Sequence, residues 1–229
     1  MTKIKLTWHG HSCFSINNEK WTLIIDPYDG EKIGYPPLHI KAHAMLSSHD
    51  HHDHNCRSAV EFLTAPGGIL KEIGLDEDWP RLPDTDTYYI KKLNTNHDDA
   101  NGTKRGSNVI HIINAAGVKL AHFGDLGHAL TQEQSSHLTD LDYVLLPVGG
   151  YYTIDAEQAS AIIRQIKPRN IIPMHYTWQF GSLPITSVEP FIEQISDLYS
   201  VEAIDSAELT DIARENGKCF TFARIISEA

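Results

Sequence analysis

Four of the 14 histidines of this 229-residue chain fall within one short stretch, Ser48-His49-Asp50-His51-His52-Asp53-His54-Asn55. Read as His49-x-His51-x-Asp53-His54, it offers three imidazoles and one carboxylate. Imidazole and carboxylate together suit Zn²⁺ and its neighbours among the divalent metals. An inert histidine-rich turn or an expression tag is the alternative, but the stretch is internal and mixed with aspartate. We therefore predict a metal-binding turn.

Two regular elements are expected to hold this turn. Residues 44–48 form an apolar-to-small run that predicts a strand, and residues 55–63 predict a helix. In an extended segment alternate side chains share a side, so His49 and His51 can converge on one point. Asp53 and His54 then fall where the predicted helix begins and can turn toward a second point nearby.

Other metal-competent side chains follow apolar runs that we expect to be strands. They are Asp26, His97, Asp125 and His175. One histidine at a strand end is more often an ordinary hydrogen-bonded residue than a ligand. Four such positions, together with the internal cluster, indicate one shared rim of a sheet. We expect Asp26 to orient a ligand imidazole, with a carboxylate that only caps the turn before Pro27 as the alternative.

The remaining pattern predicts a sheet-on-sheet core with helices outside it, in one domain over residues 1–229. Thr131 with Gln134 three residues later predicts a capped helix start. Strands are expected at 4–8, 13–17, 21–26, 44–48, 88–93, 108–114, 118–123, 141–148, 170–174 and 218–226. Helices are expected at 55–63, 131–137, 155–166 and 188–199, a loop at 28–43, and short strands and loops over 65–87.

Composition narrows the class of protein. Hydrophobic residues make up 41% and charged residues 21%, as in ordinary globular proteins. The net charge of −11 disfavours an extended nucleic-acid surface or an anionic membrane surface. The three cysteines, Cys13, Cys56 and Cys219, have unrelated spacings and imply no disulfide framework; we expect Cys56 to be packed rather than a ligand. With no signal-peptide pattern and no apolar run near the ~18 residues of a membrane span, we expect a cytoplasmic protein.

The chain resembles the metallo-β-lactamase-fold superfamily, whose five motifs run Asp, His-x-His-x-Asp-His, His, Asp, His. Asp26, the His49–His54 cluster, His97, Asp125 and His175 match these motifs in order. More closely, the chain is similar to a branch of metal-dependent hydrolases that includes the ascorbate-6-phosphate lactonases. That similarity lies in His9-Gly10-His11-Ser12, Leu23-Ile24-Ile25-Asp26-Pro27, Phe123-Gly124-Asp125-Leu126-Gly127-His128, Pro147-Val148-Gly149-Gly150 and Pro173-Met174-His175-Tyr176.

The resemblance implies an α/β fold, a four-layer αββα sandwich of two mixed sheets, with a two-metal site along its edge. It implies two divalent ions, zinc first with manganese or iron as alternatives, and a hydroxide between them that attacks the substrate. Asp53 or a metal-bound water would move the proton. One ion would take His49, His51 and His97, and the other Asp53, His54 and His175, with Asp125 bridging the two.

Several residues beside these motifs stay open in role. His122 is a rival ligand, although in a strand it faces away from Asp125. His11 and His128 are candidate catalytic residues, as substrate contacts or proton carriers, with structural hydrogen bonding as the alternative. Gly149-Gly150-Tyr151-Tyr152 is either a wall of the pocket or a turn whose glycines take positive φ.

The predicted activity is hydrolysis of an ester-type bond, a lactone or a phosphoester, in a small molecule. An iron-dependent redox enzyme of the same fold and a nuclease or phosphodiesterase acting on nucleotide-sized substrates are the alternatives, and a non-catalytic binding module is a further one. We expect neither a membrane nor an extended nucleic acid as partner, and the oligomeric state is left open.

Overall fold

The computed structural model describes residues 3–81, 84–210 and 216–225. The strands are β1 (Lys5–Gly10), β2 (Cys13–Asn17), β3 (Thr22–Ile25), β4 (Ile40–Ala42), β5 (Ala44–Leu46), β6 (Val60–Phe62), β7 (Leu70–Glu72), β8 (Tyr88–Asn96), β9 (Ser107–Ala115), β10 (Val118–His122), β11 (Tyr143–Pro147), β12 (Asn170–Met174), β13 (Ser200–Ile204), β14 (Glu208–Thr210) and β15 (Lys218–Phe222). The helices are α1 (Gly30–Ile33), α2 (Gln132–Ser136), α3 (Ala156–Ile166) and α4 (Glu189–Ile195), with a 3-10 turn η1 at Arg57–Ala59.

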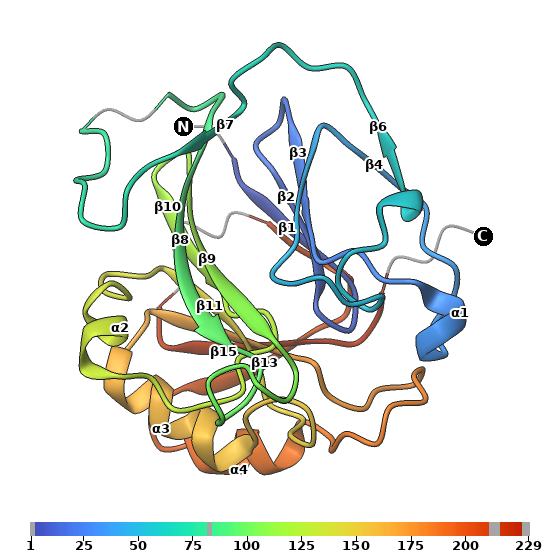
Figure 1. Cartoon of the computed structure of the whole chain (residues 1–229), viewed down its shortest axis with the longest axis vertical. Helices are drawn as coiled ribbons and strands as arrows, with labels where there is room; N and C mark the ends of the chain where they lie inside the picture. Colours follow the sequence, from blue (N-terminus) through green and yellow to red (C-terminus); the bar gives the residue numbers. More distant parts are fainter. Residues whose placement is uncertain (1–2, 82–83, 211–215, 226–229) are drawn as a thin grey trace.

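Two mixed sheets face each other and enclose the main core (Figure 1). The smaller has the order β14-β1-β2-β3-β5, and the larger has the order β13-β15-β12-β11-β10-β9-β8-β7. Buried side chains from both sheets form one hydrophobic cluster, which includes Trp8 and Phe14 of the smaller sheet and Ile112 and Leu145 of the larger. The predicted sheet-on-sheet core is confirmed.

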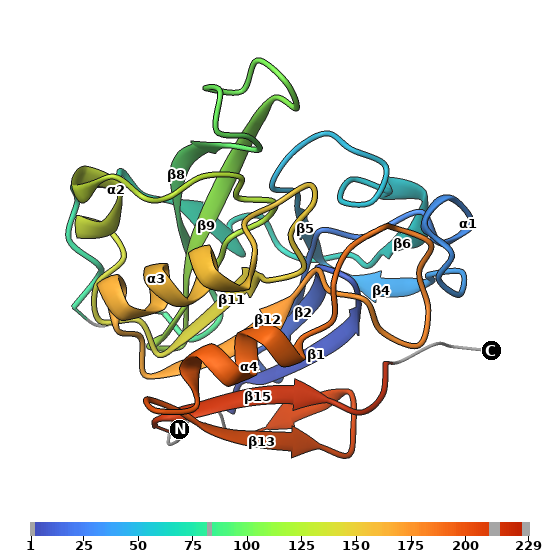
Figure 2. The same cartoon turned by 90° about the horizontal axis from the view of Figure 1, so that it is seen from below.

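Helices α2, α3 and α4 lie on the outer side of the larger sheet (Figures 1 and 2). Helix α3 buries Ala159, Ile162 and Ile163, because positions three and four apart share one face of a helix. A reciprocal pair of hydrogen bonds between Asp155 and Gln158 caps its first turn. The predicted pair at the start of α2, Thr131 with Gln134, is present in the same form.

The outer side of the smaller sheet is covered differently. Its cover consists of the one-turn helix α1, the parallel pair β4–β6 and the loops between them. A second hydrophobic cluster fills this space, with Ile24 of the sheet packing against Tyr28, Ile33 and Val60. The fold is the expected sandwich of two sheets between outer layers, and the layer on this side has little helix.

The predicted helix at 55–63 is wrong. Only η1 is helical there, and Val60–Phe62 forms strand β6 beside β4. Val60 is β-branched and Phe62 aromatic, types that favour a strand once a partner strand is available. That partner, β4, and helix α1 both fall in the stretch at 28–43 that we expected to be a loop.

Other boundaries shift by a few residues. The predicted helix at 188–199 ends at Ile195, and β13 and β14 were not predicted. The last predicted strand is observed as β15, while residue 226 lies outside the described residues. No helix among the residues that the structure describes is long and apolar enough to cross a bilayer.

Strand direction decides where the functional side chains gather. In the smaller sheet, β2 runs antiparallel between β1 and β3, and β5 is parallel to β3. In the larger, β9 runs antiparallel between β8 and β10, and β11 and β12 follow β10 in parallel. Strands β1, β3 and β5 therefore share one direction in the smaller sheet, and β8, β10 and β12 are among the strands that share one direction in the larger. In each sheet, the carboxyl ends of these strands lie at the same edge.

Candidate metal centre

Each of these six strands is followed by a residue of one buried cluster. His11 follows β1, Asp26 follows β3, and the His49–His54 turn follows β5. On the other sheet, His97 follows β8, Asp125 follows β10 and His175 follows β12. The backbone N–H of His175 donates to the carbonyl of His11 at 3.4 Å, so the two sheets touch at this edge. The predicted shared rim is confirmed, and both sheets contribute to it.

Asp125 lies at the centre of the cluster. One of its carboxylate oxygens is 3.1 Å from His54 Nε2, and the other is 3.1 Å from His97 Nε2 and 3.3 Å from His175 Nε2. His49 Nε2 is 4.0 Å from the same oxygen. The Asp125 carboxylate thus lies among the Nε2 atoms of four histidines.

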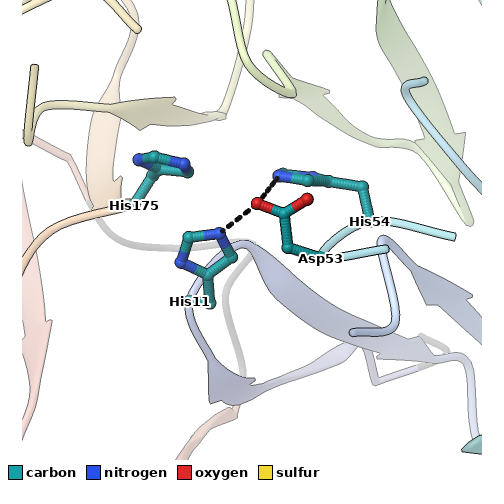
Figure 3. A group of neighbouring side chains, drawn as sticks. All are labelled: His11, Asp53, His54 and His175. Carbon is teal, nitrogen blue, oxygen red and sulfur yellow. Dashed lines mark ion pairs between the residues drawn. The ribbon is translucent and has the colours of Figure 1, made fainter. Parts of the chain in front are cut away.

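Around Asp125 the donor atoms fall into groups whose members lie within 4.8 Å of one another. His49, His51 and His97 form one group, which we call the open group because the His51 side chain is exposed. His11, Asp53, His54 and His175 form another, which we call the closed group. Figure 3 shows the closed group, with His11 and His54 both pointing at the Asp53 carboxylate. His11 Nε2 is 3.6 Å and His54 Nε2 is 3.7 Å from Asp53 Oδ2.

A buried carboxylate fixes two of the imidazoles from behind. Asp26 accepts hydrogen bonds from His54 Nδ1 at 2.8 Å and from the Ser48 hydroxyl at 2.7 Å. Because the hydroxyl proton goes to the carboxylate, Ser48 Oγ must accept from His49 Nδ1, 2.9 Å away. Both rings then direct Nε2 toward Asp125. The predicted orienting contact of Asp26 is present, and it extends through Ser48 to His49.

Burial and neighbouring charges shift the pKa values of His54 and Asp125 in opposite directions. Burial alone would lower the pKa of His54, but Asp125 and Asp26 raise it well above its ordinary value. Burial would raise the pKa of Asp125, yet the charges of His175 and His54 hold it well below its usual range. Burial and the neighbouring His175 lower the pKa of His11 to about 4, which leaves that imidazole neutral, the form that binds a metal.

The unpaired polar atoms of the cluster indicate that it can hold a metal ion. Among the described residues, several buried side-chain atoms of the cluster have no hydrogen-bond partner. They include both ring nitrogens of His11 and of His175, Nε2 of His49 and of His54, and Asp125 Oδ1. Leaving a buried polar atom unpaired costs about 1–3 kcal/mol, so a cluster of them calls for a shared partner. A cation would satisfy these lone pairs together.

Strained backbone holds three of these residues in place. His11, Asp26 and His175 have φ of 50°, 50° and 52°, in the left-handed region that non-glycine residues rarely adopt. Gly149 allows the turn at His175 to pack closely, because a Cβ at Gly149 would lie 2.2 Å from the His175 carbonyl oxygen. Each strained residue costs of order 1–3 kcal/mol, which the surrounding contacts must offset.

The other candidate catalytic and ligand residues differ in whether they join these groups. His11 joins the closed group and is 1% exposed, too buried for the substrate contact considered from the sequence. His128 lies outside both the open and the closed group, and its ring nitrogens bond the backbone of Asn96 and Ala129. His122 bonds the Ser12 carbonyl and the backbone N–H of Gly124, and it belongs to neither group. Cys56 is also outside these groups.

Asn108 holds Asp125 in place, a role that the sequence did not indicate. The Asn108 side chain accepts from the Asp125 backbone N–H at 2.9 Å and donates to the carbonyl of Phe123 and to Thr95 Oγ1. It is fully buried near the start of β9, in a run that is otherwise apolar apart from His111 and Asn114. A polar residue in such a run was the only signal in the sequence, and it does not indicate which residue the side chain contacts.

The cluster opens into a cavity of about 290 Å³. His51, Asp53, His97 and Asp125 face it from the cluster, and Arg105, Tyr152, His52 and Leu183 complete the wall. Tyr152 belongs to the segment considered either as a pocket wall or as a turn. Each description holds in part: Tyr152 lines the cavity, and Gly150 has positive φ while Gly149 does not.

Comparison with known proteins shows the family to which the chain is similar. The family model for the beta-lactamase superfamily domain matches residues 5–175. A UPF0173 metal-dependent hydrolase of Thermoplasma acidophilum is 30% identical over 190 residues, which cover 77% of this chain and 84% of the relative. A relative from Thermococcus onnurineus, also named a UPF0173 metal-dependent hydrolase, is 27% identical over 229 residues, covering 91% of this chain and 100% of the relative.

Solved structures are similar over nearly the whole chain. A Thermotoga maritima protein, named as a candidate Zn-dependent hydrolase of the metallo-β-lactamase superfamily, is 25% identical with a TM-score of 0.67, covering 96% of this chain and 98% of that one. A Parabacteroides distasonis structure has the same TM-score at 17% identity, covers 98% of this chain and 94% of that one, and shows the shared fold alone. The chain belongs to the UPF0173 family of metal-dependent hydrolases within the metallo-β-lactamase superfamily.

Proposed function

We propose that this protein hydrolyses an ester-type bond, a lactone or a phosphoester, in a small molecule, with two divalent metal ions held at the cluster. The observation that carries the proposal is the meeting of unpaired imidazole and carboxylate lone pairs around Asp125, at the base of a cavity. Zinc is the proposed metal, with manganese or iron as alternatives, because the donors are nitrogen and oxygen.

The grouping of the donor atoms divides these residues between the two proposed ions. His49, His51 and His97 would hold one, and Asp53, His54 and His175 the other, with Asp125 between them. His11 is a fourth donor for the second ion, an addition to the set expected from the sequence. When bound, such ions polarise a substrate oxygen and lower the pKa of a water molecule.

The chain's own groups supply the rest of the chemistry. Asp53 is ionised, because the nearby imidazoles of His11 and His54 outweigh burial and hold its pKa below the ordinary value. Its side chain is 14% exposed and faces the cavity, so it can accept a proton there. Asp26, through His54 and Ser48, fixes the rings that surround it.

The cavity favours a small substrate. Its volume of about 290 Å³ lies at the lower end of the range for small-molecule sites, and the chain has a net charge of −11. Both features disfavour a long nucleic acid, as expected from composition. We also propose a cytoplasmic location, since all three cysteines are free.

Elemental analysis of protein purified without added metal tests this function, combined with turnover of a lactone and of a phosphodiester. About two Zn or Mn per chain, with turnover of either ester, supports the proposal. Iron without hydrolysis would favour the redox alternative. Protein that binds no divalent metal would contradict the assignment of the cluster.

A further inference from the structure

Arg105 brings a positive charge to the wall of the cavity. Its half-buried side chain lines the cavity together with His51, His97 and Asp125. The guanidinium carbon lies 5.4 Å from the centre of the Tyr152 ring, within the range of a cation–π contact. Nη2 donates to the carbonyl of Tyr151 at 3.3 Å. The side chain is thus held against the wall by Tyr151 and Tyr152.

The loop that carries Arg105 is rigidly built. Asp98, the residue after His97, accepts four backbone N–H groups at 2.7–3.0 Å, from Ala100, Gly102, Lys104 and Arg105. The backbone N–H of His97 donates to the carbonyl of Gly106 at 3.0 Å and closes the loop. A loop tied to a residue next to a cluster histidine keeps Arg105 at a fixed place relative to the cluster.

The charge of Arg105 is not neutralised. Among the described residues, no carboxylate lies within ion-pair distance of its guanidinium, whereas the adjacent Lys104 pairs with Asp99 at 2.9 Å. Of the five N–H donors of Arg105, the structure gives a protein partner to one, the bond to Tyr151. In a chain with a net charge of −11, an arginine left unpaired beside a cavity has donors available for a ligand.

We propose that Arg105 binds an anionic group of the substrate, a phosphate or a carboxylate, that is separate from the bond to be cleaved. The planar guanidinium presents paired donors that match two oxygens of such a group. The inference rests on the proposed hydrolase function and specifies its substrate class: esters or lactones that carry an anion.

Calorimetric binding of glycerol 1-phosphate and of glycerate to the metal-loaded protein tests this role without turnover. Arg105→Gln should weaken binding of the preferred anion roughly 10- to 100-fold, the value of a charged hydrogen-bonded pair. Arg105→Lys should lose part of the affinity, since it keeps the charge without the fork. Lys104→Gln is the matched control: it removes the same charge from the same loop but not from the cavity, and should change affinity less than ~2-fold.

The anion with the larger dependence on Arg105 identifies the group that the substrate carries. Equal losses in Arg105→Gln and Lys104→Gln would overturn the proposal, because bulk charge would then explain the binding. Affinity unchanged in Arg105→Gln, with metal content equal to that of the wild type, would overturn it as well.

Turnover separates this proposal from the function on which it rests. Mono-4-nitrophenyl succinate and 4-nitrophenyl butyrate have the same acyl length and differ by one carboxylate. Arg105→Gln should raise KM for the succinate ester by roughly 10-fold or more and leave the butyrate ester unchanged. Hydrolysis of both esters without this difference would overturn the role of Arg105 alone. No hydrolysis by the wild type, with Arg105-dependent anion binding retained, would contradict the hydrolase function and support the anion site.

Discussion

The two halves of the cluster offer a metal ion different surroundings. The closed group has four donors, and three of them, His11, His54 and His175, are at most 1% exposed. The open group has three donors and includes the exposed His51 at the cavity. Structural zinc sites are filled by four protein ligands, whereas catalytic sites have three and leave one position for water or substrate. If two ions bind as proposed above, substrate would meet the ion of the open group, and the closed group would hold the other ion in place.

Removal of the metal gives the largest expected effect. Chelation should lower ester hydrolysis at least ~10³-fold, because the ions supply several kcal/mol of charge stabilisation. If the halves differ as proposed, the open group should release its ion first, and activity should fall with that first ion. The measurement follows metal content and hydrolysis over the same time course. Activity that persists until the second ion leaves would reverse the roles of the two groups.

His54→Ala is expected to remove one ion and at least ~10² of the activity while the chain stays folded. His54 is a donor of the closed group and also lies 3.1 Å from Asp125, so its loss affects the shared carboxylate. Metal content, turnover and circular dichroism give the result. Asp50→Ala is the control, since Asp50 is an exposed residue of the same turn and bonds only Asn55 among the described residues. Full activity in His54→Ala would mean a single-metal site.

A matched pair of variants compares the two groups directly. His51→Ala should lower kcat/KM roughly 10²- to 10³-fold by emptying the open group. His11→Ala should leave three donors in the closed group, weaken that ion about 10- to 100-fold and lower kcat/KM about 10-fold. Absorption spectra of the Co²⁺-substituted protein report which ion has changed its surroundings. Identical metal content and spectra in His11→Ala and the wild type would show that His11 is no ligand.

Much of this site could be predicted from the sequence because its ligands follow strands. His49, His51 and His54 share one short motif, and His97, Asp125 and His175 each follow an apolar run. Strand direction then brings them together, as it does wherever strands in one direction share an edge. The fold was predictable for the same reason, since strand runs and helix caps are local signals.

What could not be predicted depends on contacts between distant segments. The sequence near Asn108 gives no sign that its side chain holds Asp125. The sequence around His11 likewise does not show that its backbone is strained or that its ring joins the closed group. The helix predicted at 55–63 failed similarly, because β6 forms only against β4. These features depend on tertiary contacts, and local propensity yields to them.

Asp26 acts on both halves, and a comparison with Ser48 separates its two contacts. Asp26→Asn should weaken metal binding roughly 10- to 100-fold in both groups, because it bonds His54 directly and His49 through Ser48. Ser48→Ala should affect the open group, which contains His49, and leave the closed group within ~2-fold. Metal titrations of the two variants give the affinities. Equal effects of Ser48→Ala on both ions would contradict this division.

The smallest expected effect belongs to His128, a candidate catalytic residue that lies outside both groups. Its Nδ1 donates to the Ala129 carbonyl at 2.8 Å, and its Nε2 accepts the backbone N–H of Asn96, the residue before His97. His128→Ala should therefore lower the free energy of unfolding by about 1 kcal/mol, because water replaces part of these bonds. Metal content should be unchanged and turnover should fall less than ~3-fold, through slightly looser support of His97. Urea unfolding and turnover assays measure both effects. If turnover instead falls by about 10-fold or more while metal content and stability stay unchanged, His128 takes part in the reaction, and the boundary of the site has to include it.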